Sequence, residues 1–220
     1  MDETVIPFTV VLSGDPRRKE LCRKIAEIYR KIPGARDVLL LYERNPAIAF
    51  NKGAKIADTD ILFCSGGDVL VKPLDVMRMV REVGDNEVLF IVPRRSDHPL
   101  KIIGFFLDFY NRRKRILFCS GAFSVKRETI LKCPIPEKPD FMEEVLWPQK
   151  GLRFKPYFGE YYHIHLQSFS HIFNMSIKRW RARARGRSKF LLYAGCVKIF
   201  LESIVIYLEQ RLAFRDKTVL

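Results

Sequence analysis

A single acidic side chain follows a pair of glycines where a short apolar segment ends. Residues 61–64 form an unbroken apolar run, typical of a strand buried on both faces, and Asp68 is the first charge after Gly66 and Gly67. Ligands of open α/β sheets lie outside the carboxyl ends of strands, and glycines let a ligand approach the backbone. The pattern predicts that Asp68 holds a divalent metal ion, Mg²⁺ or Mn²⁺, on a diphosphate. A Gly-Gly turn with a solvated aspartate is the structural alternative.

Two histidines lie two residues apart in a segment that is predicted to be a strand. His163 and His165 fall within residues 161–166, and the alternation of side chains along a strand puts both on one face. Two imidazoles on one face suit a metal ion, so both residues are candidate ligands beside Asp68.

Two adjacent glutamates, Glu143 and Glu144, offer a different chemistry. A carboxylate can act as a general base and take the proton of an attacking hydroxyl group. Acidic residues also favour the first turn of a helix through its dipole, and this structural explanation stays open.

Positive charge is concentrated in one C-terminal stretch. The chain of 220 residues has a formal net charge of +14, and residues 178–187 are rich in arginine, including Arg179 and Arg181. Such charge favours anionic partners: a nucleotide diphosphate, an anionic membrane surface or a nucleic acid. No recognised nucleic-acid-binding motif accompanies the arginines, so we expect no nucleic-acid partner.

The elements that must position these side chains begin with a strand, a helix and a strand. Residues 7–13 are predicted to be a strand, residues 17–31 a helix with apolar residues at helical spacing, and residues 37–42 a second strand. This order predicts a parallel sheet with a right-handed crossover. Further predicted elements are a helix that ends before residue 58, a helix at 74–83, a short helix opened by residues 126–128, and strands at 87–92, 116–125 and 153–157. The fold class is therefore α/β, with a mostly parallel, Rossmann-like sheet flanked by helices.

The chain around Asp68 resembles the core of the family 2 glycosyltransferases, which have the GT-A fold. That family carries Asn-x-Gly, an alanine four residues later, a small hydrophobic strand and then Asp-x-Asp. Asn51 and Gly53 match Asn-x-Gly, and Ala57 matches the alanine. Residues 66–68 fall on Asp-x-Asp, so a glycine replaces the first aspartate. Asp68 keeps the second, which is the usual direct metal ligand of the family.

The resemblance covers roughly residues 5–190 and implies an inverting glycosyltransferase that uses a divalent metal ion and a nucleotide-diphospho-sugar donor. The donor would lie across the ends of the first three strands, and Tyr42 could stack against its base. The residues that would bind the donor are Ser13, Gly14, Asp15, Glu43, Asn51, Gly53, Gly66, Gly67, Arg179 and Arg181.

The same resemblance implies the remaining roles in the reaction. Gly121 would lie on the acceptor side, where a glycine lets substrate approach the backbone. Glu144 or Glu143 would be the general base that deprotonates the acceptor. His165, with His163 as the second choice, would face the diphosphate and could join the metal.

Residues 188–220 form a C-terminal region in this interpretation, after a GT-A domain at 1–187. Residues 190–208 are mostly apolar and nearly as long as a membrane span of about 20 residues. Lys198 and Glu202 would be unfavourable in lipid, so we expect a helix that lies in the membrane interface, packs on the domain or packs on a second copy. A helix that spans the membrane is the weaker alternative. Together with the basic stretch, this predicts a peripheral protein on the cytoplasmic face of the membrane and a lipid-linked acceptor.

The cysteines and the first residues of the chain fit that location. The five cysteines form no Cys-x-x-Cys pair, and we expect Cys22, Cys64 and Cys119 to be buried thiols in a reducing compartment. No basic segment followed by an apolar one opens the chain, so we expect no signal peptide. Asn and Gln are sparse beside Lys, Arg and Glu, a bias found in thermophilic proteins.

Two other functions stay open at this point. A membrane-bound scaffold could keep the fold after losing the first aspartate of Asp-x-Asp. A basic protein that binds nucleic acid is the weaker alternative.

Overall fold

The computed structural model describes the α/β part of the chain and several helical positions beyond it. The described residues are 5–43, 45–93, 121–137, 147, 150–163, 168–170, 173–174, 177, 200, 203–204 and 207. The predictions for residues 116–120, 164–166, 178–187 and most of 190–208 lie outside this set, as does Cys119.

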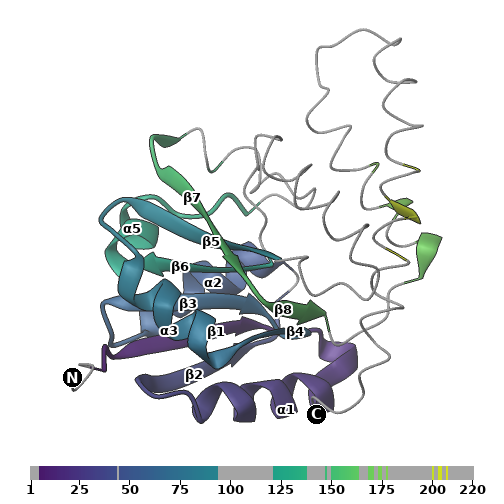
Figure 1. The fold of residues 1–220 in the computed structure, drawn as a ribbon, viewed down its shortest axis with the longest axis horizontal. Helices are drawn as coiled ribbons and strands as arrows, with labels where there is room; N and C mark the ends of the chain where they lie inside the picture. The colour runs from purple at the N-terminus through teal and green to yellow at the C-terminus, as the bar shows by residue number, and fades with distance from the viewer. Residues whose placement is uncertain are drawn as a thin grey trace, which may run out of the picture.

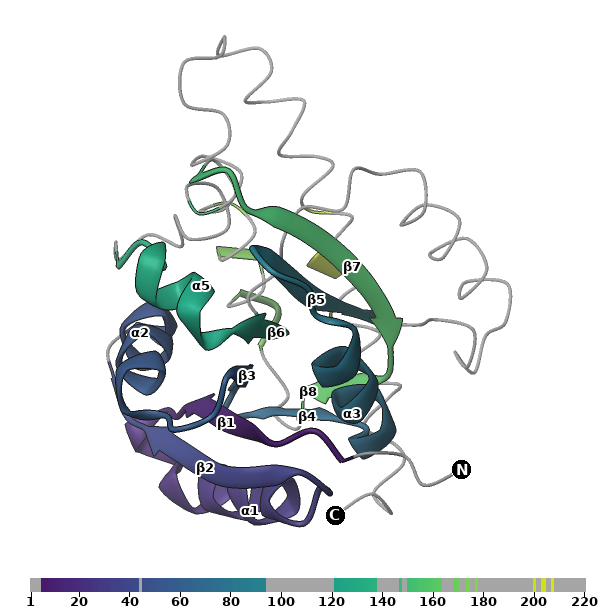
Figure 2. The ribbon, with the colours of Figure 1, turned by 90° about the vertical axis from the view of Figure 1, so that its left-hand side faces the viewer.

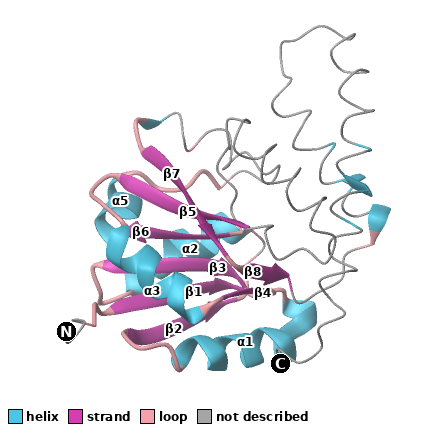
Figure 3. Ribbon diagram, viewed as in Figure 1, coloured by secondary structure: helices cyan, strands magenta, loops and turns pink. Residues whose placement is uncertain are grey.

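Within the described part of the chain, six strands form the central sheet, in the order β2-β1-β3-β6-β5-β7 (Figure 1, Figure 3). β1 pairs in parallel with β2 and β3, and β5 pairs in parallel with β7. Because β6 pairs antiparallel with both β3 and β5, it runs against the other five strands of this sheet. The predicted α/β class with a mostly parallel sheet is confirmed. The strands are β1 (Phe8–Ser13), β2 (Ala35–Leu41), β3 (Ile61–Gly66), β5 (Glu87–Pro93), β6 (Ala122–Lys126) and β7 (Arg153–Gly159).

Helices cover both faces of the sheet (Figure 2). α1 and α3 pack on one face with Phe63 of β3, and α2 and α5 pack on the other with Phe123 of β6. Burial on both faces explains why the strands have continuous apolar runs. The helical elements are the 3₁₀ helix η1 (Pro16–Arg18), α1 (Lys19–Arg30), α2 (Pro46–Ile56), α3 (Pro73–Glu82) and α5 (Arg127–Lys132).

A second sheet of two strands follows the carboxyl end of β3. It pairs β4 (Val69–Val71) antiparallel with β8 (Tyr161–His163). The sequence predicted a small-residue turn at residues 65–67 and no strand directly after it, so β4 is an addition to the prediction. α1 fixes β4, because the buried hydroxyl of Tyr29 donates to the Val69 carbonyl at 3.2 Å and accepts from the Val71 amide at 3.0 Å.

Two local predictions need correction. Gly121 is a turn residue directly before β6 and does not lie inside a strand. The helix predicted at 17–31 begins instead with the 3₁₀ turn of η1, because the Asp15 side chain accepts a hydrogen bond from the Arg17 amide and caps that turn. Cys22 and Cys64 are free and buried, as predicted.

Aromatic rings pack together at the described helical positions near the C-terminus. The ring centroid of Phe169 is 5.7 Å from that of Phe200 and 5.9 Å from that of Tyr207, and Phe173 is 5.9 Å from Phe200. Phe200 and Tyr207, the two described aromatic residues of the apolar region, therefore pack against Phe169, and Phe200 also packs against Phe173. Among the described residues, no helix has the length and apolar character needed to cross a membrane.

Candidate functional site

The carboxyl ends of three strands meet at one edge of the central sheet. Ser13, at the end of β1, pairs with Leu41 of β2 and with Gly66 of β3. The Gly67 amide donates to the Ser13 carbonyl at 2.7 Å, and the Gly14 amide donates to the Leu41 carbonyl at 2.8 Å. Backbone hydrogen bonds thus hold together the segments that carry four of the predicted donor residues.

Two of these positions are glycines because neighbouring atoms leave no room for a Cβ: mainly backbone atoms at Gly67 and side-chain atoms at Gly14. A Cβ atom on Gly67 would lie 2.9 Å from the Gly14 Cα, 3.0 Å from the Ser13 carbonyl oxygen and 2.9 Å from the Cys22 Sγ. A Cβ atom on Gly14 would lie 2.7 Å from the ring of Tyr42. A side chain at either position would push the segments apart.

Gly121 lies at the same edge. Its carbonyl accepts a hydrogen bond from the Gly66 amide at 3.1 Å and a longer one from the Ser65 hydroxyl at 3.5 Å. The turn before β6 is therefore beside the glycines that precede Asp68. The structure brings the predicted acceptor-side residue and the predicted donor residues together.

Asp68 faces the guanidinium group of Arg18 across this edge. The Arg18 Nη1 lies 3.9 Å from the Asp68 Oδ2, and the two side chains are 32% and 29% exposed. That separation is too long for a direct hydrogen bond, so the two groups form a loose ion pair. Both retain hydrogen-bonding capacity toward a ligand.

Asp15 and Arg17 are engaged with each other. The Asp15 carboxylate accepts from the Arg17 amide at 2.9 Å, from its Nε at 3.1 Å and from its Nη2 at 3.0 Å. The side-chain hydrogen bond from Arg17 lowers the pKa of Asp15 below its ordinary value. Asp15 thus shapes the turn after β1, while its predicted contact with a donor would have to compete with Arg17.

Glu43 follows β2, as the sequence predicted, and Tyr42, predicted to be the last residue of that strand, also lies just after it. Both residues make contacts. The Tyr42 ring packs against Gly14, and the Lys19 ammonium lies 5.8 Å from its centroid. Burial raises the pKa of the Tyr42 phenol. The Glu43 carboxylate is paired with the Lys52 Nζ at 2.9 Å. A nucleotide at this edge would meet the ring and the ion pair.

Asn51 and Gly53 connect α2 to the rest of the core. The Asn51 Nδ2 donates to the Ile135 carbonyl at 2.9 Å and to the Glu137 Oε1 at 2.8 Å, and its Oδ1 accepts from the Ile135 amide at 2.9 Å. A Cβ atom on Gly53 would lie 2.4 Å from the Val11 Cγ1. The packing and hydrogen bonds of the fold therefore explain the asparagine at 51 and the glycine at 53 without a bound sugar donor.

His163 is brought close to Asp68 by the pairing of β8 with β4. The Cα of His163 is the partner of Val69, the residue that follows Asp68. No feature of the local sequence shows this neighbourhood, because β4 and β8 are far apart in the chain. His165 lies two residues further on and is outside the described residues.

Asp75, which sequence reasoning missed, holds the corner between β7 and β8. Its buried carboxylate accepts from the Tyr157 hydroxyl at 2.8 Å and from the Glu160 amide at 2.8 Å. The Lys72 amide also donates to the Glu160 carbonyl at 3.1 Å. Burial, with a further contribution from the Asp75 hydrogen bond, raises the pKa of Tyr157 to about 12. An acidic residue in the first turn of a helix gives no local sign of this role.

The remaining site predictions lie outside the described residues: Glu143, Glu144, His165, Arg179 and Arg181. Within the part of the chain that is described, no group of three or more His, Cys, Asp or Glu could hold a metal ion. Mg²⁺ is commonly bound by one or two carboxylates together with substrate phosphates. The single carboxylate of Asp68 therefore fits a metal ion that binds together with a diphosphate.

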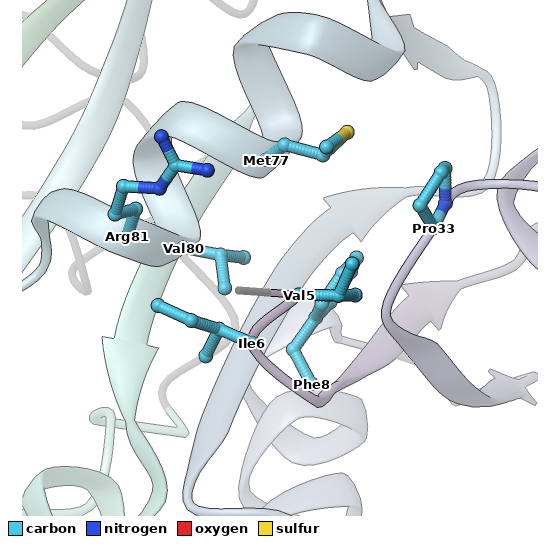
Figure 4. A pocket seen from close by; sticks show the side chains of 7 residues that line it. All are labelled: Val5, Ile6, Phe8, Pro33, Met77, Val80 and Arg81. Carbon is cyan, nitrogen blue, oxygen red and sulfur yellow. The ribbon is translucent and has the colours of Figure 1, made fainter. Parts of the chain in front are cut away.

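A small apolar hollow lies at the opposite edge of the sheet, where β1 begins (Figure 4). It is lined by Val5, Ile6, Phe8, Pro33, Met77, Val80 and Arg81. None of the predicted site residues lines it. The candidate site is thus the edge at Ser13, Gly67 and Asp68.

No protein-family model matches this chain, and no curated protein matches it in sequence. Solved structures do match. Glucosyl-3-phosphoglycerate synthase from Mycobacterium tuberculosis, in complex with Mn²⁺, UDP-glucose and phosphoglyceric acid, matches with a TM-score of 0.55 and 10% identity, over 83% of this chain and 79% of that chain. The same enzyme in complex with Mg²⁺ and UDP matches with a TM-score of 0.53 and 12% identity, over 83% and 79% of the two chains.

The chain has a GT-A-like fold. A nucleotidyl transferase from Methanothermobacter thermautotroptrophicus also matches, with a TM-score of 0.43 and 11% identity, over 70% of this chain and 88% of that chain. A TM-score below 0.5 does not establish a shared fold, so the GT-A-like fold rests on the higher-scoring pair.

Proposed function

We propose that this protein transfers a sugar from a nucleotide-diphospho-sugar to an acceptor hydroxyl group with inversion. The observation that carries the proposal is the arrangement at one sheet edge. Backbone bonds hold the ends of β1, β2 and β3 together, and Asp68 lies there with its carboxylate in a loose ion pair. The structures with the same fold hold UDP-glucose with Mn²⁺, or UDP with Mg²⁺, which supports a nucleotide-sugar donor.

Residues of this chain would bind both the base and the diphosphate of the donor. Tyr42 offers an aromatic face for the base, and the close contact of Gly14 with Gly67 leaves backbone without side chains beside the diphosphate. Asp68 would hold Mg²⁺ or Mn²⁺, which when bound neutralises charge on the diphosphate. His163, and His165 beyond it, would face the same groups from β8.

The transfer needs a proton acceptor on the acceptor side. The acceptor oxygen bonds to the anomeric carbon while the bond from that carbon to the phosphate oxygen breaks. The hydroxyl proton passes to Glu144 or Glu143, and the nucleoside diphosphate leaves with the electron pair. Arg179 and Arg181 would stabilise the leaving diphosphate as fixed positive charges.

The experiment is a thermal-shift screen with UDP-, GDP- and dTDP-sugars in the presence of Mn²⁺, followed by turnover with the sugar that binds. We expect Asp68→Asn to lose turnover. Asp58→Asn is the matched control, because Asp58 is exposed and precedes β3 at the opposite end of that strand. If no donor raises the unfolding temperature and none is turned over, the proposal is wrong.

Gly66 favours one second candidate, a scaffold that keeps the fold without catalysis. The family has an aspartate where Gly66 stands, and a site with one fewer carboxylate binds a metal ion less tightly. Binding of a nucleotide sugar without transfer or hydrolysis, in the wild type and in Asp68→Asn alike, would support the scaffold.

The acceptor and the location form the last part of the proposal. The net charge of +14 supports a reaction at an anionic membrane surface and a lipid-linked acceptor. Sedimentation with vesicles of phosphatidylserine and phosphatidylcholine, compared with phosphatidylcholine alone, measures this. We expect binding to the anionic vesicles, and weaker binding at high salt.

A further inference from the structure

We infer that Arg18 binds the diphosphate of the donor and supplies positive charge at a site that has one carboxylate fewer than the family pattern. The inference rests on the proposed function, since it names the residue that takes the diphosphate. It concerns a residue that lies outside the matched motif and next to an arginine with a different role.

Arg17 and Arg18 have different partners in the structure. The Arg17 guanidinium is bound by the Asp15 carboxylate through two nitrogens, and its side chain is 86% exposed. The Arg18 side chain is 32% exposed and its guanidinium points to the Asp68 carboxylate. Of the two adjacent arginines, Arg18 is therefore the one at the candidate site.

The backbone fixes the position from which Arg18 reaches the site. Its amide donates to the Asp15 carbonyl at 2.9 Å, and the residue lies at the junction between η1 and α1. The next turn of α1 carries Cys22, whose sulfur is close to Gly67. Arg18 is thus held beside the segment that joins β3 to Asp68.

The loose ion pair between Arg18 and Asp68 can be replaced by a stronger interaction of Arg18 with an anionic ligand. An ion pair in which both side chains are about one-third exposed contributes little stability, and the 3.9 Å separation leaves the guanidinium donors available. A diphosphate carries more negative charge than one carboxylate and matches the planar guanidinium with two acceptor oxygens. A bound diphosphate would therefore replace Asp68 as the partner of Arg18, and the Asp68 carboxylate would become available for other ligands.

Calorimetric titration of the full chain tests the inference with inorganic pyrophosphate and with UDP, GDP and dTDP. Each titration is made in EDTA and in Mn²⁺. We expect the wild type to bind at least one of these in EDTA, and Arg18→Gln to bind it about tenfold more weakly or worse, as expected for lost charge-assisted hydrogen bonds. Arg18→Lys should fall between the two, because it keeps the charge without the planar fork.

Arg30→Gln is the matched control, since Arg30 is exposed at the other end of the same helix. It should bind as the wild type does, and all three variants should unfold at the wild-type temperature. Equal affinities of Arg18→Gln and the wild type in EDTA would overturn the inference, as would a wild type that binds no diphosphate without Mn²⁺. Failure of the proposed function is a separate result: Arg18-dependent binding with no sugar transfer from any donor.

Discussion

The Gly67 amide donates to the Ser13 carbonyl over 2.7 Å, so the ends of β1 and β3 are joined by backbone atoms. The site edge therefore depends on the absence of a side chain at Gly67. A Cβ atom added at Gly67 would meet backbone atoms of Ser13 and Gly14, which cannot rotate away as a side chain could.

We expect Gly67→Ala to lower the free energy of unfolding by about 1–3 kcal/mol, the range for overpacking in a tight core. It should also weaken binding of the nucleoside diphosphate, because the segment that carries Asp68 moves away from Gly14. Urea unfolding and calorimetric titration measure the two effects. Gly84→Ala is the control, since a Cβ there has no neighbour closer than 3.9 Å. A Gly67→Ala variant as stable as Gly84→Ala would contradict the close contact.

The second prediction concerns Asp75 as a positioning residue. Asp75→Asn removes the carboxylate that accepts from Tyr157 and Glu160, and we expect a loss of about 1.5–3 kcal/mol in the free energy of unfolding. Tyr157→Phe removes one of the two bonds and should lose about 1 kcal/mol. Because β8 brings His163 to Asp68, Asp75→Asn should also weaken nucleotide binding in Mn²⁺ more than in EDTA. Equal weakening in both conditions would assign Asp75 a purely structural role.

The third prediction is an alkaline loss of stability that depends on Tyr29. Burial raises the pKa of Tyr29 from its ordinary value of 10.0 to about 12 in the folded protein. Between these values the unfolded chain loses the phenolic proton while the folded chain keeps it. The contribution of Tyr29 is thus complete below pH 10 and is lost as the pH rises toward 12.

Tyr29→Phe provides the comparison for this pH dependence. It removes the hydroxyl that bonds to Val69 and Val71, so we expect about 1–3 kcal/mol less stability at pH 8. The difference between wild type and variant should shrink when urea unfolding is repeated at pH 11. A difference that is the same at both pH values would show that Tyr29 does not titrate with a raised pKa.

The fourth prediction distinguishes two roles for Asn51. Asn51→Ala leaves the buried amide and carbonyl of Ile135 without this partner, so we expect a loss of at least about 2 kcal/mol in the free energy of unfolding. The affinity for a nucleoside diphosphate, measured where both proteins are folded, should stay close to that of the wild type. A large loss of affinity with little loss of stability would instead assign Asn51 to the donor site, as the family resemblance implies.

The parts of the fold that the sequence predicts are those with a local signal. The apolar residues of β1, β2, β3 and β5 form continuous runs in the chain, and the glycines at the ends of β1 and β3 follow these runs directly. Their parallel order follows from the helices between them. The positions of Ser13, Gly14, Gly66 and Gly67 at one edge followed from that order and were predicted.

Other features depend on pairs that are distant in the chain. β4 has only three residues, and its pairing with β8 is what identifies it as a strand. In sequence, Asp75 is an ordinary acidic residue in the first turn of a helix, and its role follows from its hydrogen bonds with Tyr157 and Glu160. Arg17 and Arg18 are equivalent in sequence, and the geometry of Asp15 separates them. Asn51 matched a motif, although its amide is used by the segment at Ile135.

The pairing of Val69 with His163 also has a consequence for biosynthesis. The ribosome releases β3 and Asp68 long before it releases β8, and non-local pairings are slow to form because a long loop must close first. A nascent chain can therefore complete its first βαβ unit while the edge beside Asp68 still lacks a strand. During synthesis, an unpaired β4 would therefore be open to pairing with the wrong partner.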